Sequence, residues 1–208
     1  MTRIALLQGH PDVAGGHLVN ALEDAYLAGA AEAGHEVRRI PVAGLSFPLL
    51  RSADDFYNGA APQGVLAAQE AIRWADHLVI LYPLWYGNFP AILHGLLEQI
   101  FRPGFAMGDS GGGLAPKRLF VGKTARIVVT MGMPAAFYRW VYRAHSLKVL
   151  QRNLLGFVGF APVWSTLIGM QGAGMDTSRY TKIFPTLGGT AIRRRRLAEM
   201  RRLGRLGR

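Results

Sequence analysis

The feature that most constrains the fold is a set of five short segments that are apolar on both faces. Strands that cover one side of a core alternate apolar and polar residues, whereas strands that are apolar throughout are typical of parallel sheets covered on both sides. Segments with helical periodicity separate these five, as in repeated strand–helix units. The predicted strands are 3–8, 36–40, 78–81, 126–130 and 164–168.

Apolar residues recur at helical spacing between the strands. Gly34 follows one such segment at the position where helices commonly end, and Pro90 suits the first turn of another. The predicted helices are 17–33, 65–75, 90–101 and about 137–155, and the predicted irregular segments are 41–63, 102–122 and 171–189. This pattern predicts an α/β fold, a flavodoxin-like doubly wound five-stranded parallel sheet of order 2-1-3-4-5 with helices on both faces.

Charge is concentrated at the C-terminal end of the chain. The formal net charge is +11, and residues 193–208 contribute +7 through eight arginines and one glutamate, which leaves +4 for the other 192 residues. We interpret 1–190 as one flavodoxin-like domain and 191–208 as a basic helix or tail. This segment is either a solvated helix end or a weak contact for a membrane surface or a polyanion. Nothing in the loops indicates specific recognition of nucleic acid.

The composition excludes several classes of protein. There is no cysteine, which excludes disulfides, thiol nucleophiles and iron–sulfur sites. No apolar run approaches the ~18–20 residues that a membrane-spanning helix needs. The apolar segment near the N-terminus is too short for a signal peptide, so we expect a cytoplasmic protein.

Three loops are expected to meet at one edge of the sheet. Doubly wound sheets bind ligands beyond the carboxyl ends of their strands, where the strand order reverses. The loops there are 9–17, 83–89 and 131–138. The first precedes a helix N-terminus, which favours a phosphate, and its His10 and His17 add side-chain donors.

The other two loops carry flat or apolar side chains. Trp85 and Tyr86 follow a buried strand directly, and a planar ligand would offset the exposure of their rings. Taken alone, these rings could equally cap the core, and the methionines of the third loop could fill gaps in packing. The residues predicted to bind a flavin are His10, Gly16, His17, Leu18, Pro83, Leu84, Trp85, Tyr86, Gly87, Thr130, Met131, Gly132 and Met133. We predict no metal site.

The run YPLWYGNFPAIL at 82–93 resembles the FPL-x-W-x-G-x-PAIL-K-G signature of the NAD(P)H:quinone oxidoreductases, the DT-diaphorase-like flavoproteins of the flavodoxin-like superfamily. Residues 98–106 and the pair His10-Pro11 extend the resemblance. The chain departs from the family pattern at Gly87, where relatives have a second aromatic residue, and at His94, where many have lysine.

The resemblance implies a flavin, either FMN or FAD, that takes hydride from NAD(P)H and reduces a quinone-like acceptor by two electrons. It implies a homodimer as well. Tyr138 and His145 are the positional matches to the family's tyrosine and histidine that assist charge and proton movement at the reduced flavin, although the spacing between them is one residue longer here.

Two other functions stay open at this point. Some members of the family are redox-sensing regulatory subunits of membrane potassium-efflux systems, so a regulatory role is one alternative. The other is a flavin-free protein of the same fold that binds polyanions through its arginine-rich segment. The sequence does not separate FMN from FAD or NADH from NADPH, and it does not identify the acceptor.

Overall fold

The computed structural model describes residues 1–110, 116–170 and 189–208. Its main sheet has five strands in the order β2-β1-β3-β6-β7, and every neighbouring pair is parallel. The strands are β1 (Arg3–Gln8), β2 (Glu36–Pro41), β3 (His77–Pro83), β6 (Thr124–Thr130) and β7 (Val163–Ile168). This confirms the predicted fold class and strand order.

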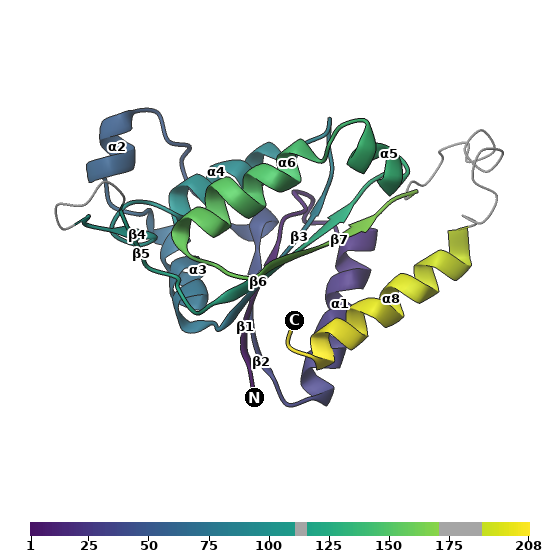
Figure 1. The fold of residues 1–208 in the computed structure, drawn as a ribbon. Coiled ribbons are helices and arrows are strands. Elements are labelled where there is room, and N and C mark those ends of the chain that lie inside the picture. The colour runs from purple at the N-terminus through teal and green to yellow at the C-terminus, as the bar shows by residue number, and fades with distance from the viewer. Residues whose placement is uncertain (111–115, 171–188) are drawn as a thin grey trace.

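Helices cover both faces of this sheet (Figure 1). They are α1 (Leu18–Glu32), α3 (Gln63–Trp74), α4 (Ala91–Ile100), α5 (Ala135–Trp140), α6 (His145–Lys148), a π-helical turn (Val149–Gly156) and α8 (Gly189–Arg205). In the described ranges, no helix is long and apolar enough to cross a membrane. All but the last residue of the segment 171–189, predicted to be irregular, lies outside the described residues.

Two segments predicted to be irregular contain short elements. The first holds a 3₁₀ turn (Val42–Gly44) and α2 (Ala53–Asn58), which Ser52 caps by accepting a hydrogen bond from the Asp55 amide. The second holds β4 (Met107–Gly108) and β5 (Lys117–Arg118), which pair in an antiparallel ribbon. The Pro, Gly and Ser content predicted breaks in the chain but not these pairings, which depend on contacts distant in sequence.

The single helix predicted over 137–155 is wrong. The chain breaks between α5 and α6, where Arg143 and Ala144 both have positive φ. Buried Tyr138 accounts for the break, because its hydroxyl bonds to Ser146 Oγ at 2.8 Å and accepts a bond from the Leu147 amide at 3.3 Å. A straight helix would place residues eight and nine positions apart too far along its axis for these bonds.

Successive residues along a strand pack in two separate cores, one on each face of the sheet. Ala5 and Leu7 of β1 pack in a large core with α3, α4 and the residues around α6. Ile4 and Leu6 point to the other face and pack with α1 and α8. Both faces of the central strands β1, β3 and β6 are therefore buried, as continuous apolar runs predict. The prediction is wrong for β2, an edge strand that is mostly exposed and carries Glu36, Arg38 and Arg39.

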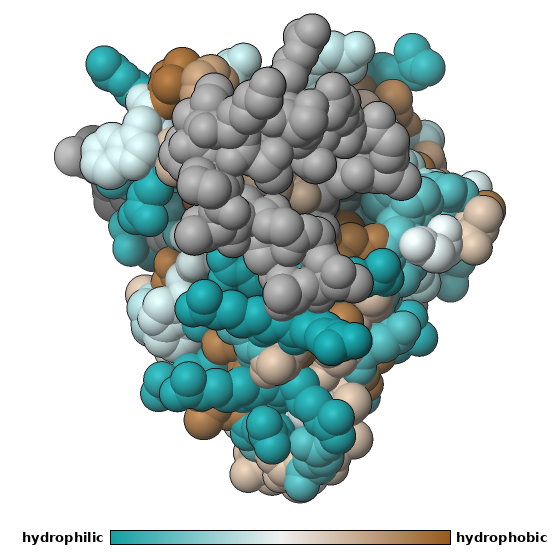
Figure 2. Space-filling view, turned by 90° about the vertical axis from the view of Figure 1, so that its right-hand side faces the viewer, coloured by the Kyte–Doolittle hydropathy of each residue, from teal (hydrophilic) through white to brown (hydrophobic). Residues whose placement is uncertain are grey.

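The basic C-terminal segment forms α8, which lies beside α1 on this second face (Figure 1). Met200 of α8 is fully buried in the second core. A Cβ at Gly29 would lie 1.9 Å from the Arg201 carbonyl oxygen, and one at Gly204 would lie 2.0 Å from the Tyr26 carbonyl oxygen. The two helix backbones thus touch, and the outward surface is largely hydrophilic (Figure 2).

Candidate functional site

Gly9 allows the loops after β1 and β3 to approach closely. Its amide donates to the Leu81 carbonyl at 2.7 Å. A Cβ at this position would lie 2.6 Å from Leu93 Cδ2 and 3.1 Å from the Leu81 oxygen, so no side chain fits without displacing its surroundings. The chain therefore turns away from β1 with its backbone directly against β3 and α4.

A cluster of polar residues organises the loop before α1. The rings of His10 and His17 stack with centroids 3.8 Å apart, and His17 Nε2 lies 2.7 Å from the Asp12 carboxylate. His10 Nδ1 accepts from the Asp12 amide at 3.1 Å, so the neutral ring carries its proton on Nε2. Burial, and then the neighbouring His17, lower the pKa of His10. The bond from His17, followed by the Ala14 amide, lowers the pKa of Asp12.

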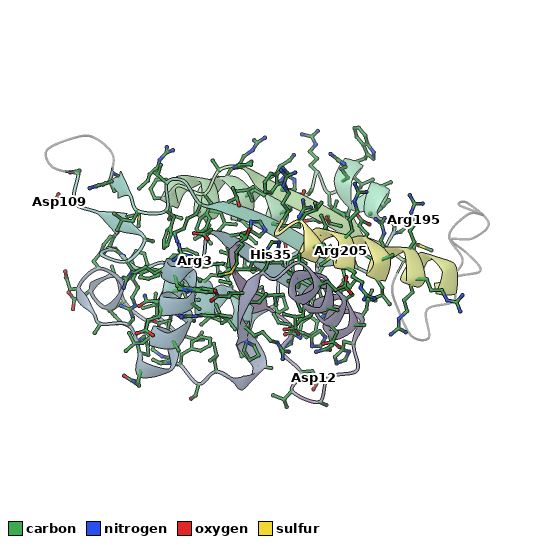
Figure 3. The ribbon with its side chains drawn as sticks, turned by 90° about the horizontal axis from the view of Figure 1, so that it is seen from below. Arg3, Asp12, His35, Asp109, Arg195 and Arg205 are labelled. Atoms are coloured by element: carbon green, nitrogen blue, oxygen red, sulfur yellow. The ribbon has the colours of Figure 1, made fainter. Side chains whose placement is uncertain are left out.

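Sequence reasoning missed the role of Asp12, which Figure 3 labels in the loop that leads into α1. Its carboxylate holds His17 and also accepts from the Ala14 amide at 2.8 Å. The sequence contained a signal for this role, because in turns an aspartate commonly accepts a hydrogen bond from the backbone amide two residues further along the chain. His17 itself is the N-cap of α1, and its amide donates to Asn20 Oδ1 at 3.1 Å.

The loop after β3 makes a tight turn that exposes two aromatic rings. Trp85 and Asn88 exchange backbone hydrogen bonds of 2.8 and 2.9 Å, and Tyr86 and Gly87 between them both have positive φ. This is the two-residue turn that favours glycine, so placing a tyrosine there costs on the order of 1 kcal/mol. Trp85 is 48% exposed and Tyr86 is fully exposed. Strain and exposure together set this turn apart from residues that fill the core.

Contacts join the loop after β3 to its two neighbours. The edge of the Trp85 ring faces His10 with the ring centroids 6.0 Å apart, which connects it to the loop before α1. The Leu84 amide donates to the Thr130 carbonyl at 2.7 Å, at the end of β6. Beyond β6, buried Met131 donates to the Ile168 carbonyl at 2.9 Å. The three predicted loops therefore meet at one edge of the sheet.

Backbone donors without partners gather on these loops. In the described part of the chain, the amides that donate no hydrogen bond in these loops include those of Gly15, Gly16, Tyr86, Gly87, Gly132 and Met133. Gly15 and Gly16 have positive φ, and nothing lies within 4 Å of where their Cβ atoms would be. The α1 N-terminus adds the amide of Leu18, which comes too early in the helix for an intrahelical bond. Such a set of free donors suits an anionic or carbonyl-rich ligand.

Tyr138 and His145 occupy different surroundings. Tyr138 is fully buried with its hydroxyl held by Ser146 and by the Leu147 amide, whereas the side chain of His145 is exposed at the start of α6. Tyr82 is also fully buried, and it lies near Tyr138 and Ser146. The structure therefore brings Tyr138 to the α5–α6 break rather than to the exposed face of the three loops.

A cavity of about 760 Å³ lies beside this region, between β7 and the break that follows α5. Its cationic lining residues are Arg139, Arg143 and Lys148, and Trp140 adds an indole ring. Another cavity, of about 460 Å³, lies between the start of α4 and the segment after the 3₁₀ turn. Neither cavity is lined by the residues predicted to bind the flavin.

The sheet order and the position of the three loops define a doubly wound α/β protein of the flavodoxin type. The chain belongs to the flavodoxin-like fold family, whose sequence profile matches residues 2–182. Relatives within it carry the name NAD(P)H oxidoreductase or quinone reductase, which confirms the resemblance drawn from the sequence.

Two curated relatives match part of the chain. Human ribosyldihydronicotinamide dehydrogenase (quinone) is 32% identical over 96 residues, 44% of this chain and 41% of that protein. The glutathione-regulated potassium-efflux system ancillary protein KefG of Enterobacter sp. (strain 638) is 37% identical over 71 residues, 34% of this chain and 36% of that protein. The chain thus spans about two fifths of the length of these relatives.

Two solved structures match the whole chain in fold. The NAD(P)H:quinone oxidoreductase from Methanothermobacter marburgensis has a TM-score of 0.78 at 23% identity, over 100% of this chain and 99% of that one. An FMN-dependent NADH-azoreductase from Bacillus anthracis in complex with FMN has a TM-score of 0.71 at 16% identity, over 100% of both chains. At these identities, the likeness is one of fold.

Proposed function

We propose that the protein is a flavin-dependent NAD(P)H oxidoreductase that reduces a quinone-like acceptor by two electrons. The observation that carries the proposal is the meeting of free backbone donors and exposed aromatic rings on three adjacent loops. The names of the partial relatives support the reaction class. When bound, the flavin supplies the redox chemistry, accepting two electrons from NAD(P)H and passing them to the acceptor.

The residues present fit the mononucleotide end of a flavin, which FMN and FAD share. The phosphate would lie at the open cradle of Gly15 and Gly16, with the Leu18 amide and the Nε2 proton of His10 as donors. His17, held by Asp12, would border it on the side of α1.

The ring of the flavin would lie against Trp85. Leu84, Trp85 and Asn88 already use their amides within the protein, so the donors to the polar rim would be Tyr86 and Gly87. Pro83 and Thr130 would position this loop, because the Leu84 amide is fixed on the Thr130 carbonyl.

The third loop would stabilise negative charge on the bound group. Gly132 and Met133 present free amides beyond the end of β6, and preorganised N–H donors aimed at developing charge are the strongest such devices in enzymes. Met131 is buried and would hold this loop by packing. We propose Tyr138 as a positioning residue that fixes the α5–α6 break behind the loop, and exposed His145 as the group that moves a proton.

The Trp85→Ala variant is expected to bind flavin at least about fivefold more weakly than the wild type, because an aromatic stacking contact is worth about 1 kcal/mol beyond simple burial. Flavin binding is measured by fluorescence titration and by the visible spectrum of the purified protein. NADH and NADPH are then added anaerobically, and bleaching of the spectrum is the expected result for at least one of them. Tyr57→Ala, which removes an exposed ring on α2, is the matched control. A wild-type protein that takes up no flavin contradicts the proposal.

We also propose that two copies of the chain associate through α5 and the residues just after it. Phe137, Trp140, Val141 and Tyr142 are all exposed there, and Trp140 reaches 79%. Monomeric proteins rarely expose a contiguous patch of this kind. The relevant partner is a second copy, as the family resemblance implies.

Trp140→Glu is expected to shift the protein from the mass of a dimer to that of a monomer, since it replaces the most exposed ring of the interface by a charge that must lose its water on association. Light scattering coupled to size-exclusion chromatography measures the mass. The corresponding change Tyr57→Glu, at an exposed aromatic on α2, should leave the mass unchanged. A monomeric wild type would exclude this interface.

A redox-sensing ancillary subunit is the second candidate function, favoured by the name of the Enterobacter relative. The two functions differ in turnover. An oxidoreductase consumes NADH or NADPH steadily when a quinone is present, whereas a sensor binds flavin and nucleotide without sustained consumption. Steady-state absorbance of the nicotinamide therefore separates them.

A further inference from the structure

We propose that the outward face of α8 docks the protein onto bilayers that contain anionic lipids. This surface lies away from the three loops of the candidate site, and the proposal does not depend on flavin or on redox activity. It depends on how the fold divides the arginines of the C-terminal segment between internal pairs and an exposed stripe.

The C-terminal part of the helix is fixed on the body of the protein. Met200 is buried in the core that α8 shares with α1, and the backbones of the two helices touch at Gly29 and Gly204. At the far end, His35 Nδ1 accepts from the Thr2 amide, so Nε2 carries the proton and donates to the Arg205 carbonyl at 3.1 Å. The face opposite Met200 is therefore held outward.

Four arginines of the C-terminal segment have partners within the protein. Arg196 pairs with Glu199 at 2.6 Å, and Arg201 pairs with Glu32 of α1. The Arg208 guanidinium lies 5.6 Å from the centre of the Trp164 ring. Arg205, which Figure 3 labels on α8, reaches the second oxygen of Glu32 at 3.7 Å.

The arginines on the outward face are exposed and lack such partners. Among the described residues, Arg194, Arg195 and Arg202 form no ion pair, and all three are exposed. At 100° per residue they fall on the side opposite Met200. Figure 2 looks onto this side of the molecule, where hydrophilic side chains gather around α8, and Figure 3 labels Arg195 on the same helix. Arg194, Arg195 and Arg202 thus form a cationic stripe on the outward side of α8, beside Arg205.

The chemistry of the stripe favours lipid over nucleic acid. Exposed Ala198 lies on the same side and can enter the headgroup layer between the arginines. No aromatic residue occurs in 193–208, so the helix offers no ring on which a base could stack. Anionic lipids also diffuse laterally and can gather beneath a linear array of fixed charges.

The test is sedimentation of the purified full-length protein with phosphatidylcholine vesicles, with and without phosphatidylglycerol. We expect binding only when phosphatidylglycerol is present and a fall in binding as salt is raised. The triple variant Arg194→Gln, Arg195→Gln, Arg202→Gln should bind these vesicles on the order of 100-fold more weakly, from the typical contribution of three basic residues near an anionic surface. Glutamine keeps the helix propensity of the segment.

A matched triple variant, Arg51→Gln, Arg118→Gln, Arg152→Gln, removes the same charge from exposed positions on other elements and should keep wild-type vesicle binding. Circular dichroism and flavin titration check that both variants fold and that the candidate site is intact. The proposal is overturned if wild-type protein does not bind the anionic vesicles, if both triple variants lose binding equally, or if the protein binds duplex DNA but not the vesicles at the same salt.

Discussion

Lowering the pH from 6.5 to 4 is expected to reduce the free energy of unfolding by about 3 kcal/mol through His77 alone. Burial, and then the charge of Arg126, lower the pKa of this histidine to about 4, from 6.5 in the unfolded chain. The ring is almost fully buried at the start of β3, with Nδ1 at 2.7 Å from Thr124 Oγ1 and Nε2 without a partner.

The direction of this change in unfolding free energy follows from proton binding. Between pH 6.5 and about 4, the unfolded chain protonates this histidine while the folded protein keeps it neutral, so the unfolded state binds more protons and stability falls as the pH falls. Each pH unit in this window corresponds to about 1.4 kcal/mol. Buried His10 has a lowered pKa for the same reason and adds a contribution of the same sign.

Urea unfolding at a series of pH values from 7 to 4 measures this dependence. His77→Asn keeps a polar group near the Nδ1 position but does not titrate, so its stability should depend on pH less steeply by up to about 1.4 kcal/mol per unit in that window. The exposed His94→Asn is the matched control and should keep the wild-type slope. Equal slopes in the wild type and His77→Asn would show that His77 does not titrate as described.

Gly29→Ala is expected to destabilise the protein by about 2 kcal/mol, although alanine is the better residue for an isolated helix by about 1 kcal/mol. The added Cβ would lie 1.9 Å from the Arg201 carbonyl oxygen, so α8 must move away from α1 to admit it. Backbone is the obstacle here, and backbone cannot rotate aside as the end of a flexible side chain can. Helix propensity predicts a gain in stability and the contact with Arg201 predicts a loss, so the sign of the measured change tests whether α8 packs against α1.

Two measurements report this effect. The unfolding midpoint in urea gives the change in stability, and limited digestion with trypsin reports whether α8, with its many arginines, has loosened. Gly44→Ala is the control, because nothing lies within 4 Å of where that Cβ would be, and no loss of stability is expected. A Gly29→Ala variant as stable and as resistant to trypsin as the wild type would mean that the two helices are not in close contact.

Local pattern determined the architecture of this protein. Short strand-like runs, the central ones apolar on both faces, are separated by helical periodicity, and this pattern predicts a parallel sheet with two covered faces and three loops at one edge. The turn at 83–89 was recognised from the run YPLWYGNFPAIL as a whole, because its two rings taken alone could equally cap the core. These inferences use only the properties of neighbouring residues.

The tertiary structure alone decided how distant residues pair. The break between α5 and α6 depends on Tyr138 bonding to Ser146 and Leu147, and no local signal in 137–155 marks it. Likewise, Glu32 pairs with Arg201 and the Trp164 ring faces Arg208, from positions far away in the sequence. Sequence periodicity sets which face of an element is buried, whereas the choice of partner is made when whole elements pack, because many residues of the same type compete for each contact.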